Sequence, residues 1–235
     1  MSLPLRRPLA LTAALLIAVG SAACSISSDS RSSESSSSST SSAASTAEET
    51  TEAPAAQATV PEGYTLTAVG DSGISLALPA HWTVMDSSTL ADPAAIQAKL
   101  NEAGSSYSAE LIAAVAQADF YALDLTGTSN VPATAYAVPL PTPELPDEEA
   151  LAAGISVFNG TPGEFTEVTT PLGDAVTLGF TSEQQAADGS TVTFHGAQIA
   201  LPTPAGTYEL VTVLTQDAAQ TQEIADAITS SAQAS

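Results

Sequence analysis

Two late segments of the chain decide its fold: residues 191–201, TVTFHGAQIAL, and residues 208–215, YELVTVLT. In each segment apolar residues alternate with polar or small ones, and this period of two is typical of a half-buried β-strand. Pro204-Ala205-Gly206 lies between them and has the composition of a turn. Two similar segments precede them, Phe165–Thr169 and Ala175–Phe180. Four consecutive strands joined by turns predict an antiparallel meander.

Strand patterns also open the folded part of the chain. Tyr64–Ala68 and Ile74–Leu78 alternate in the same way, and Gly70-Asp71-Ser72-Gly73 joins them, which predicts a β-hairpin. The residues from Pro79 to Val84 predict a turn that leads into another short strand. Two further runs of period two predict strands over Tyr121–Leu125 and Thr134–Leu140.

Two helices are expected between these groups of strands. Asp92 and Pro93 have the residue types of an N-cap and a first helical position. Ile96 and Leu100 follow on one face of this helix, which should end near Gly104. Apolar residues at helical spacing then predict a second helix over residues 108–118.

Two more helices complete the secondary structure. The third begins after Pro146, closes at Asn159-Gly160, and has three apolar residues on one face: Leu151, Ile155 and Phe158. The last begins at Asp217 with Gln220 as a capping partner, and two of its residues should face the sheet: Ile224 and Ile228. Strands early and late with helices between them predict an α+β fold, an antiparallel sheet with helices packed on it.

This order of elements resembles the PsbP-like fold group, which includes the LpqN-type lipoproteins of actinobacteria. Three places carry the resemblance: the strand that runs into proline and tryptophan over residues 74–82, the late meander, and the ending from Tyr208 through Ile228. The resemblance implies an α/β/α sandwich and an accessory or binding role. The group shares no catalytic motif, so the resemblance assigns no site residue to this chain.

The first residues have the organisation of an export signal. Arg6 and Arg7 form a basic start, Leu9–Val19 is a mainly apolar run, and Gly20–Ala23 supplies small residues. The apolar run is shorter than the roughly 20 residues that a membrane-spanning helix needs. Residues 1–23 are therefore predicted to be a cleaved signal peptide. General secretion is the favoured route, and the paired arginines leave the twin-arginine route open.

Ser21-Ala22-Ala23-Cys24 resembles the lipobox of bacterial lipoproteins, although Ser21 stands where that motif prefers a branched apolar residue. Cys24 is the only cysteine of the chain and falls directly after the signal. We therefore expect Cys24 to be lipidated and to hold the protein by acyl chains at the outer face of the cytoplasmic membrane, within the cell envelope. Ordinary signal-peptidase cleavage after Ala23, without lipid, is the alternative.

Composition divides the mature chain into a linker and one domain. Residues 24–59 are rich in Ser, Thr and Ala and lack aromatic residues, which predicts a disordered linker after the lipidated cysteine. Residues 60–235 suit a single α+β domain. Removal of residues 1–23 leaves two cations, Arg31 and Lys99, against 26 acids, a formal net charge of −24. Such a charge excludes nucleic acid as a partner.

Few residues are candidates for catalysis or metal binding. Gly70-Asp71-Ser72-Gly73 resembles the nucleophile segment of chymotrypsin-type proteases, but that family needs a His and an Asp upstream, so the segment is interpreted as a turn. His81 and His195 are the only histidines, and neither has a ligand partner at helical spacing. On a strand, a buried Trp82 would leave His81 exposed. The acids at 147–149 are interpreted as helix-start residues rather than calcium ligands.

These observations favour a non-enzymatic envelope lipoprotein without a cofactor. Its domain would bind a protein partner, or an apolar or glycan ligand, during cell-envelope assembly or transport. An exported hydrolase and a calcium-dependent adhesive or sensing domain remain as alternatives. An apolar binding surface without a catalytic group would favour the binding protein, whereas Ser72 or His195 bonded to an acid would favour the hydrolase.

Overall fold

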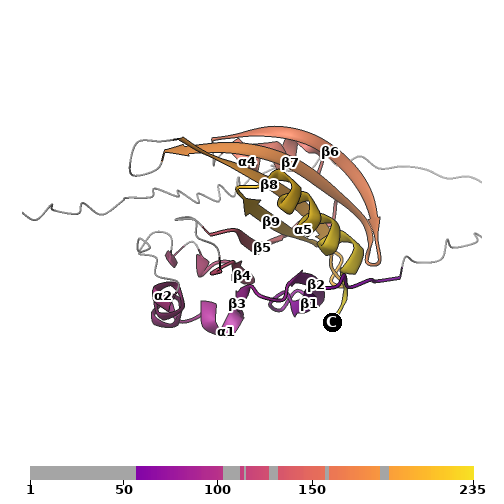
Figure 1. Ribbon diagram of the computed structural model, residues 1–235. Helices are drawn as coiled ribbons and strands as arrows, with labels where there is room; N and C mark the ends of the chain where they lie inside the picture. Colours follow the sequence, from indigo (N-terminus) through magenta and orange to yellow (C-terminus); the bar gives the residue numbers. More distant parts are fainter. Residues whose placement is uncertain (1–56, 103–111, 114, 127–131, 157–158, 186–190) are drawn as a thin grey trace, which may run out of the picture. The chain divides into compact units, whose positions relative to one another are not determined.

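A computed structural model describes residues 57–102, 112–113, 115–126, 132–156, 159–185 and 191–235 (Figure 1). The described residues all belong to one compact unit. The predicted signal peptide, Cys24 and the linker up to residue 56 lie outside the described residues, so their roles stay predictions. No helix among the described residues has the length and hydropathy needed to cross a bilayer.

A seven-stranded antiparallel sheet forms the centre of the fold, in the order β3-β4-β5-β9-β8-β7-β6 (Figure 1). Its strands are β3 (Thr83–Met85), β4 (Phe120–Leu123), β5 (Thr134–Leu140), β6 (Gly160–Thr170), β7 (Gly173–Gln185), β8 (Thr191–Pro202) and β9 (Tyr208–Thr215). The predicted meander of four late strands is confirmed, and three of its strands are longer than predicted.

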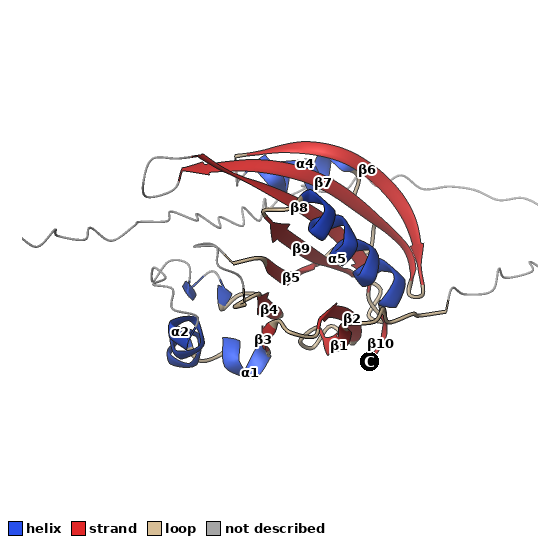
Figure 2. Ribbon diagram, in the orientation of Figure 1, coloured by secondary structure: helices blue, strands red, loops and turns tan. Residues whose placement is uncertain are grey.

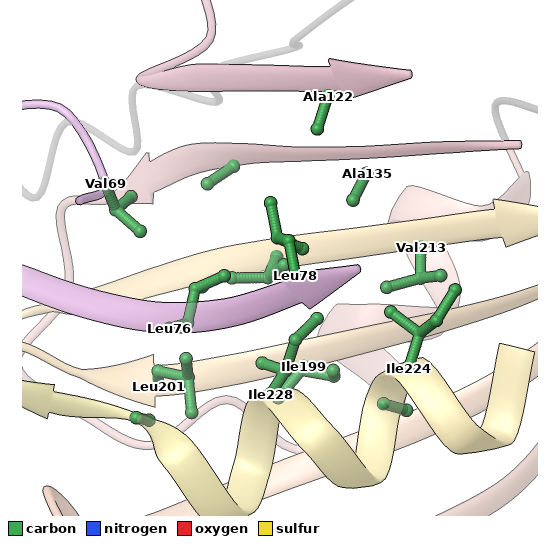
Figure 3. Packing of buried hydrophobic residues seen from close by; sticks show 14 of the residues in the cluster. Val69, Leu76, Leu78, Ala122, Ala135, Ile199, Leu201, Val213, Ile224 and Ile228 are labelled. Atoms are coloured by element: carbon green, nitrogen blue, oxygen red, sulfur yellow. The ribbon is translucent and has the colours of Figure 1, made fainter. Parts of the chain in front are cut away.

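One face of this sheet is covered by helix α5 (Ala218–Ser231) and by a small sheet of three strands. The small sheet has the order β1-β2-β10 and consists of β1 (Tyr64–Ala68), β2 (Ile74–Pro79) and β10 (Gln233–Ala234). Figure 2 shows α5 lying along the long strands. The side chains that fill this core come from β2, α5 and the sheet, among them Leu76, Leu78, Ile199, Val213, Ile224 and Ile228 (Figure 3).

Helices cover parts of the opposite face in two separate clusters. The first packs α1 (Ser87–Leu90) and α2 (Pro93–Glu102) against β3 and β4 through residues such as Leu90, Ile96 and Leu123. The second packs α4 (Glu148–Ser156) against β7 and β8 through residues such as Leu151, Ile155 and Leu178. With helices on both faces of antiparallel strands, the predicted α+β fold is confirmed.

Aspartates begin the helices as their residue types predict. Asp217 accepts the main-chain amides of Ala219 and Gln220 at 2.8 and 3.0 Å, and Asp92 accepts that of Ala94 at 2.9 Å. Each such bond satisfies an amide that has no partner within the helix. One cap was not predicted: Asp86 begins α1, and its hydrogen bond from the Thr89 amide holds the pKa of the carboxyl below its usual range.

Several predicted details differ from the structure or lie outside it. The predicted hairpin forms, but Leu66 of β1 pairs with Ala77 and stays 39% exposed, whereas Thr67 pairs with the core residue Leu76. The apolar rows of the two strands therefore face opposite sides. Strand β10 was not predicted. Of the second predicted helix, residues 112–113 and 115 are helical, and residues 108–111 and 114 lie outside the described residues. Gly104, near which the first helix was expected to end, and Phe158 also lie outside them.

Candidate binding face and buried carboxyl pair

Two of the candidates for catalysis or metal binding, Ser72 and Asp147, make hydrogen bonds that stabilise a turn and a helix start. Ser72 donates its hydroxyl to the carbonyl of Val69 within the hairpin turn, where Gly70 and Gly73 have φ values of 43° and 75°. A positive φ favours glycine, so the motif serves the turn. Asp147 caps α4 by accepting the Ala150 amide at 2.9 Å. The described residues contain no cluster of three or more His, Cys, Asp or Glu that could hold a metal ion.

The two histidines contact residues other than Ser72. His81 is exposed and its Nε2 lies 3.7 Å from Oδ2 of Asp124, while Trp82 is buried in the core, as predicted. His195 lies on β8, where its carbonyl accepts the hydroxyl of Thr221 at 3.1 Å. Within the described residues, no hydrogen bond joins Ser72 or His195 to an acid. The arrangement required for a serine hydrolase is therefore not assembled there.

An apolar surface lies on β5 and β9, where the two helical clusters meet. Its residues are apolar and half-buried: Tyr136, Val138 and Leu140 on β5, and Tyr208, Leu210 and Leu214 on β9. The two strands are paired, so that Val138 lies opposite Leu210 and Leu140 opposite Tyr208. These six residues share one side of the two strands, which we call the β5–β9 face, and the buried Thr212, opposite Tyr136, separates Leu214 from the other five.

The other side of the same two strands is largely buried, and Pro139 near the end of β5 is its exposed residue. Ala135, Ala137, Val211 and Val213 point there and are all 0% exposed, because α5 and β2 cover them. Successive residues of a strand point to opposite faces. The six apolar residues of the β5–β9 face therefore keep some exposure, although Thr212 between them is 2% exposed, while α5 and β2 pack against the other side of the strands.

Polar groups lie beside these apolar residues. The ring of Tyr136 stacks on that of Tyr121 with centroids 6.2 Å apart, and burial raises the pKa of the Tyr136 hydroxyl against the opposing effect of a hydrogen bond from Thr212. Gln198 lies opposite Thr212 on β8 and is buried, and its Oε1 has no hydrogen-bond partner among the described residues. An apolar surface with a few polar groups is typical of a ligand site.

A pair of carboxyl groups lies on the opposite, largely buried face. Glu209 of β9 is 1% exposed and hydrogen-bonded to Asp119, which directly precedes β4. Burial, together with the charge of Asp119, raises the pKa of Glu209 to about 8. Burial also raises the pKa of Asp119, and the charge of Asp71 adds to this effect. Near neutral pH Glu209 therefore carries a proton and donates it to Asp119.

Both features were missed from the sequence, although part of the signal was present. Tyr208, Leu210 and Leu214 alternate with Glu209, Val211 and Val213 along β9, so the strand has two apolar faces with one acid among the inward residues. An acid in such a position indicates a buried carboxyl group. Its partner Asp119 lies 90 positions earlier in the sequence and could not be inferred from local spacing.

Comparison with known proteins finds likeness among solved structures. No family model and no curated protein matches the chain. The solution structure of cyanobacterial PsbP (CyanoP) from Synechocystis sp. PCC 6803 is similar at 11% identity and a TM-score of 0.44, over 74% of this chain and 93% of that chain. The crystal structure of LpqN, involved in cell envelope biogenesis of Mycobacterium tuberculosis, is similar at 13% identity and a TM-score of 0.38, over 72% and 89%.

Both structures belong to the fold group that the sequence resembles. At these identities and TM-scores the likeness concerns the arrangement of the chain and carries no argument about function.

Proposed function

We propose that this chain is an exported lipoprotein, anchored through Cys24 at the outer face of the cytoplasmic membrane, that binds an uncharged apolar ligand on the β5–β9 face. Its role would be accessory, in the assembly of the cell envelope or in transport within it. The observation that carries the proposal is the set of six half-buried apolar residues on one side of two strands whose other side is largely buried.

The physical argument rests on burial and charge. A ligand that covers these side chains removes apolar surface from water, which contributes roughly 25 cal/mol per Å². The chain carries a formal net charge of −22, which disfavours anionic ligands. No charged residue belongs to the set itself. An uncharged apolar chain, such as the hydrocarbon part of an envelope lipid, therefore fits the face better than a charged metabolite.

Binding of a neutral apolar dye, N-phenyl-1-naphthylamine, to the full chain tests the proposal. Leu210→Thr removes apolar surface from the face and introduces a β-branched residue, a type that is favoured in strands. Leu66→Thr makes the same change at an exposed position of β1, outside the face. We expect Leu210→Thr to raise the Kd about 5- to 30-fold, from a loss of about 1–2 kcal/mol, and Leu66→Thr to leave it unchanged.

Two results would contradict this function. One is dye binding by the wild-type chain that Leu210→Thr and Leu66→Thr reduce equally. The other is the absence of saturable dye binding by the wild-type chain.

A further inference from the structure

The turn between β1 and β2 lies directly against Asp119. A Cβ atom on Gly70 would come within 2.9 Å of both the Cβ and the carbonyl oxygen of Asp119, a distance that real Cβ atoms do not show. Asp119 is itself fixed to the large sheet, because its amide donates to the carbonyl of Ala137 on β5 at 2.9 Å. Asp119 is therefore bonded to the large sheet and packed against the hairpin turn of the small sheet.

Glu209, on β9, is the side-chain hydrogen-bond partner of Asp119. Its two cross-strand neighbours, Pro139 on β5 and Leu201 on β8, carry no charge, and its side chain is 1% exposed. One of its oxygens, Oε1, has no hydrogen-bond partner among the described residues. The bond to Asp119 is thus the contact that satisfies this buried carboxyl group, and it requires a proton between the two acids.

The charged groups around the pair are acids. The negative charge of Asp71, on the hairpin turn, contributes to the raised pKa of Asp119. Strand β2 carries no charged residue. The acids of α5 are engaged elsewhere: Glu223 accepts the Tyr64 hydroxyl at 3.1 Å, and Asp226 accepts the Gln222 side-chain amide at 2.8 Å. Ionisation of Glu209 would therefore add a third negative charge to those of Asp71 and Asp119, where the small sheet packs on the large sheet.

We propose that Asp119 and Glu209 form a proton-operated latch, in which one shared proton holds the β1–β2 turn against the large sheet and its loss releases the turn. The device is independent of the β5–β9 face, which lies on the other side of β9. It makes the attachment of the small sheet sensitive to the pH outside the cell, where the exported domain would reside.

The sign of the pH effect follows from the two protonation equilibria. The pKa of Glu209 is about 8 in the closed state, against a usual value of 4.5. The closed state therefore keeps a proton that the open state releases. The stabilisation is fully present below about pH 4.5 and is lost as the pH rises toward 8. Within that window the opening constant should rise by at most about tenfold per pH unit.

Hydrogen–deuterium exchange of the full chain between pH 5.5 and 7.5 tests the latch, after correction for the intrinsic pH dependence of exchange. Peptides covering residues 64–79 and 118–123 should show an opening constant that rises by up to about 100-fold, and peptides from β8 should not. Glu209→Gln keeps the shape and cannot ionise, so its opening constant should be flat. Glu167→Gln, at an exposed position of β6, is the matched control and should behave as wild type.

The pH dependence of the wild-type opening constant tests the latch even where a variant fails to fold. An opening constant for residues 64–79 that stays flat over this range overturns the latch. An equal rise in β8 would show global unfolding instead of local release, and an equal rise in Glu209→Gln would show that another group is responsible. Either result also overturns it.

Discussion

At the scale of the residue, Phe180 and Ile155 occupy space that two glycines leave open. A Cβ atom on Gly196 would lie 2.1 Å from Cζ of Phe180, and one on Gly160 would lie 2.5 Å from Cγ2 of Ile155. Phe180 and Ile155 belong to the cluster that fixes α4 on the sheet. The two glycines therefore determine how closely this helix packs next to the β5–β9 face.

Gly196→Ala should destabilise the domain, because the new methyl group displaces the Phe180 ring within a packed core. Overpacking of this kind costs about 1–3 kcal/mol. Gly154→Ala, within α4, is the control: its Cβ would lie 3.4 Å from the side-chain nitrogen of Gln198, and alanine favours a helix over glycine by about 1 kcal/mol. Urea denaturation should show a lower free energy of unfolding for Gly196→Ala and no decrease for Gly154→Ala. Equal stability of the two variants would contradict the packing described.

At the scale of the element, the register of β1 against β2 decides which residues belong to the core. Leu76 and Leu78 point into the core, and their partners on β1 are Thr67 and Thr65. Leu66 lies on the other side of the hairpin. Because side chains alternate with a period of two, the same two strands paired one residue out of register would exchange these roles.

Leu76→Ala and Leu66→Ala make the same chemical change on the two sides of this hairpin. Leu76 is 0% exposed, so its truncation should leave a cavity and cost about 2–5 kcal/mol. Leu66 is 39% exposed, and its truncation should change the free energy of unfolding by no more than about 0.5 kcal/mol. Denaturant midpoints measure both. A larger loss for Leu66→Ala would show that the register is different.

Elements with local signals were predictable, and those that depend on distant partners were not. Asp92 and Asp217 identify their helices because a cap acts within three residues, and the alternation of the late strands identifies the meander. Strand β10 has two residues and exists because it pairs with β2, about 160 positions earlier. The carboxyl pair and the β5–β9 face likewise depend on pairings between distant segments, which no local pattern contains.

At the scale of the whole molecule, the acidic charge is balanced by few opposite charges. The chain has 4 basic residues against 26 acidic ones. The anionic field that results favours solubility and keeps anionic surfaces at a distance. Electrostatic attraction to anionic head groups therefore does not favour binding of the domain to a membrane, and the proposed lipid on Cys24 would supply the attachment.

Cys24→Ala should abolish incorporation of radiolabelled palmitate and release the protein from the membrane fraction. The reason is that the thiol of Cys24 is the only one in the chain that can receive an acyl group. Ser25→Ala, one residue further on, is the control and should label as wild type. Labelling and fractionation of cells expressing the three forms provide the measurement. Palmitate retained by Cys24→Ala would refute the anchor.

The first and last strands of the described chain belong to the three-stranded sheet, and the segment before β1 is bonded to the last turn of α5. The amide of Thr59 donates to the carbonyl of Ser230 at 2.9 Å just before β1, and the amide of Ser235 donates to Gly73 at 2.9 Å just after β10. Strands β1 and β10 flank β2 on its two edges. A stretching force applied between the two ends would therefore pass through β1, β2 and β10, and the long strands of the large sheet would bear little of it. The mechanical strength of the domain should be that of its smallest sheet.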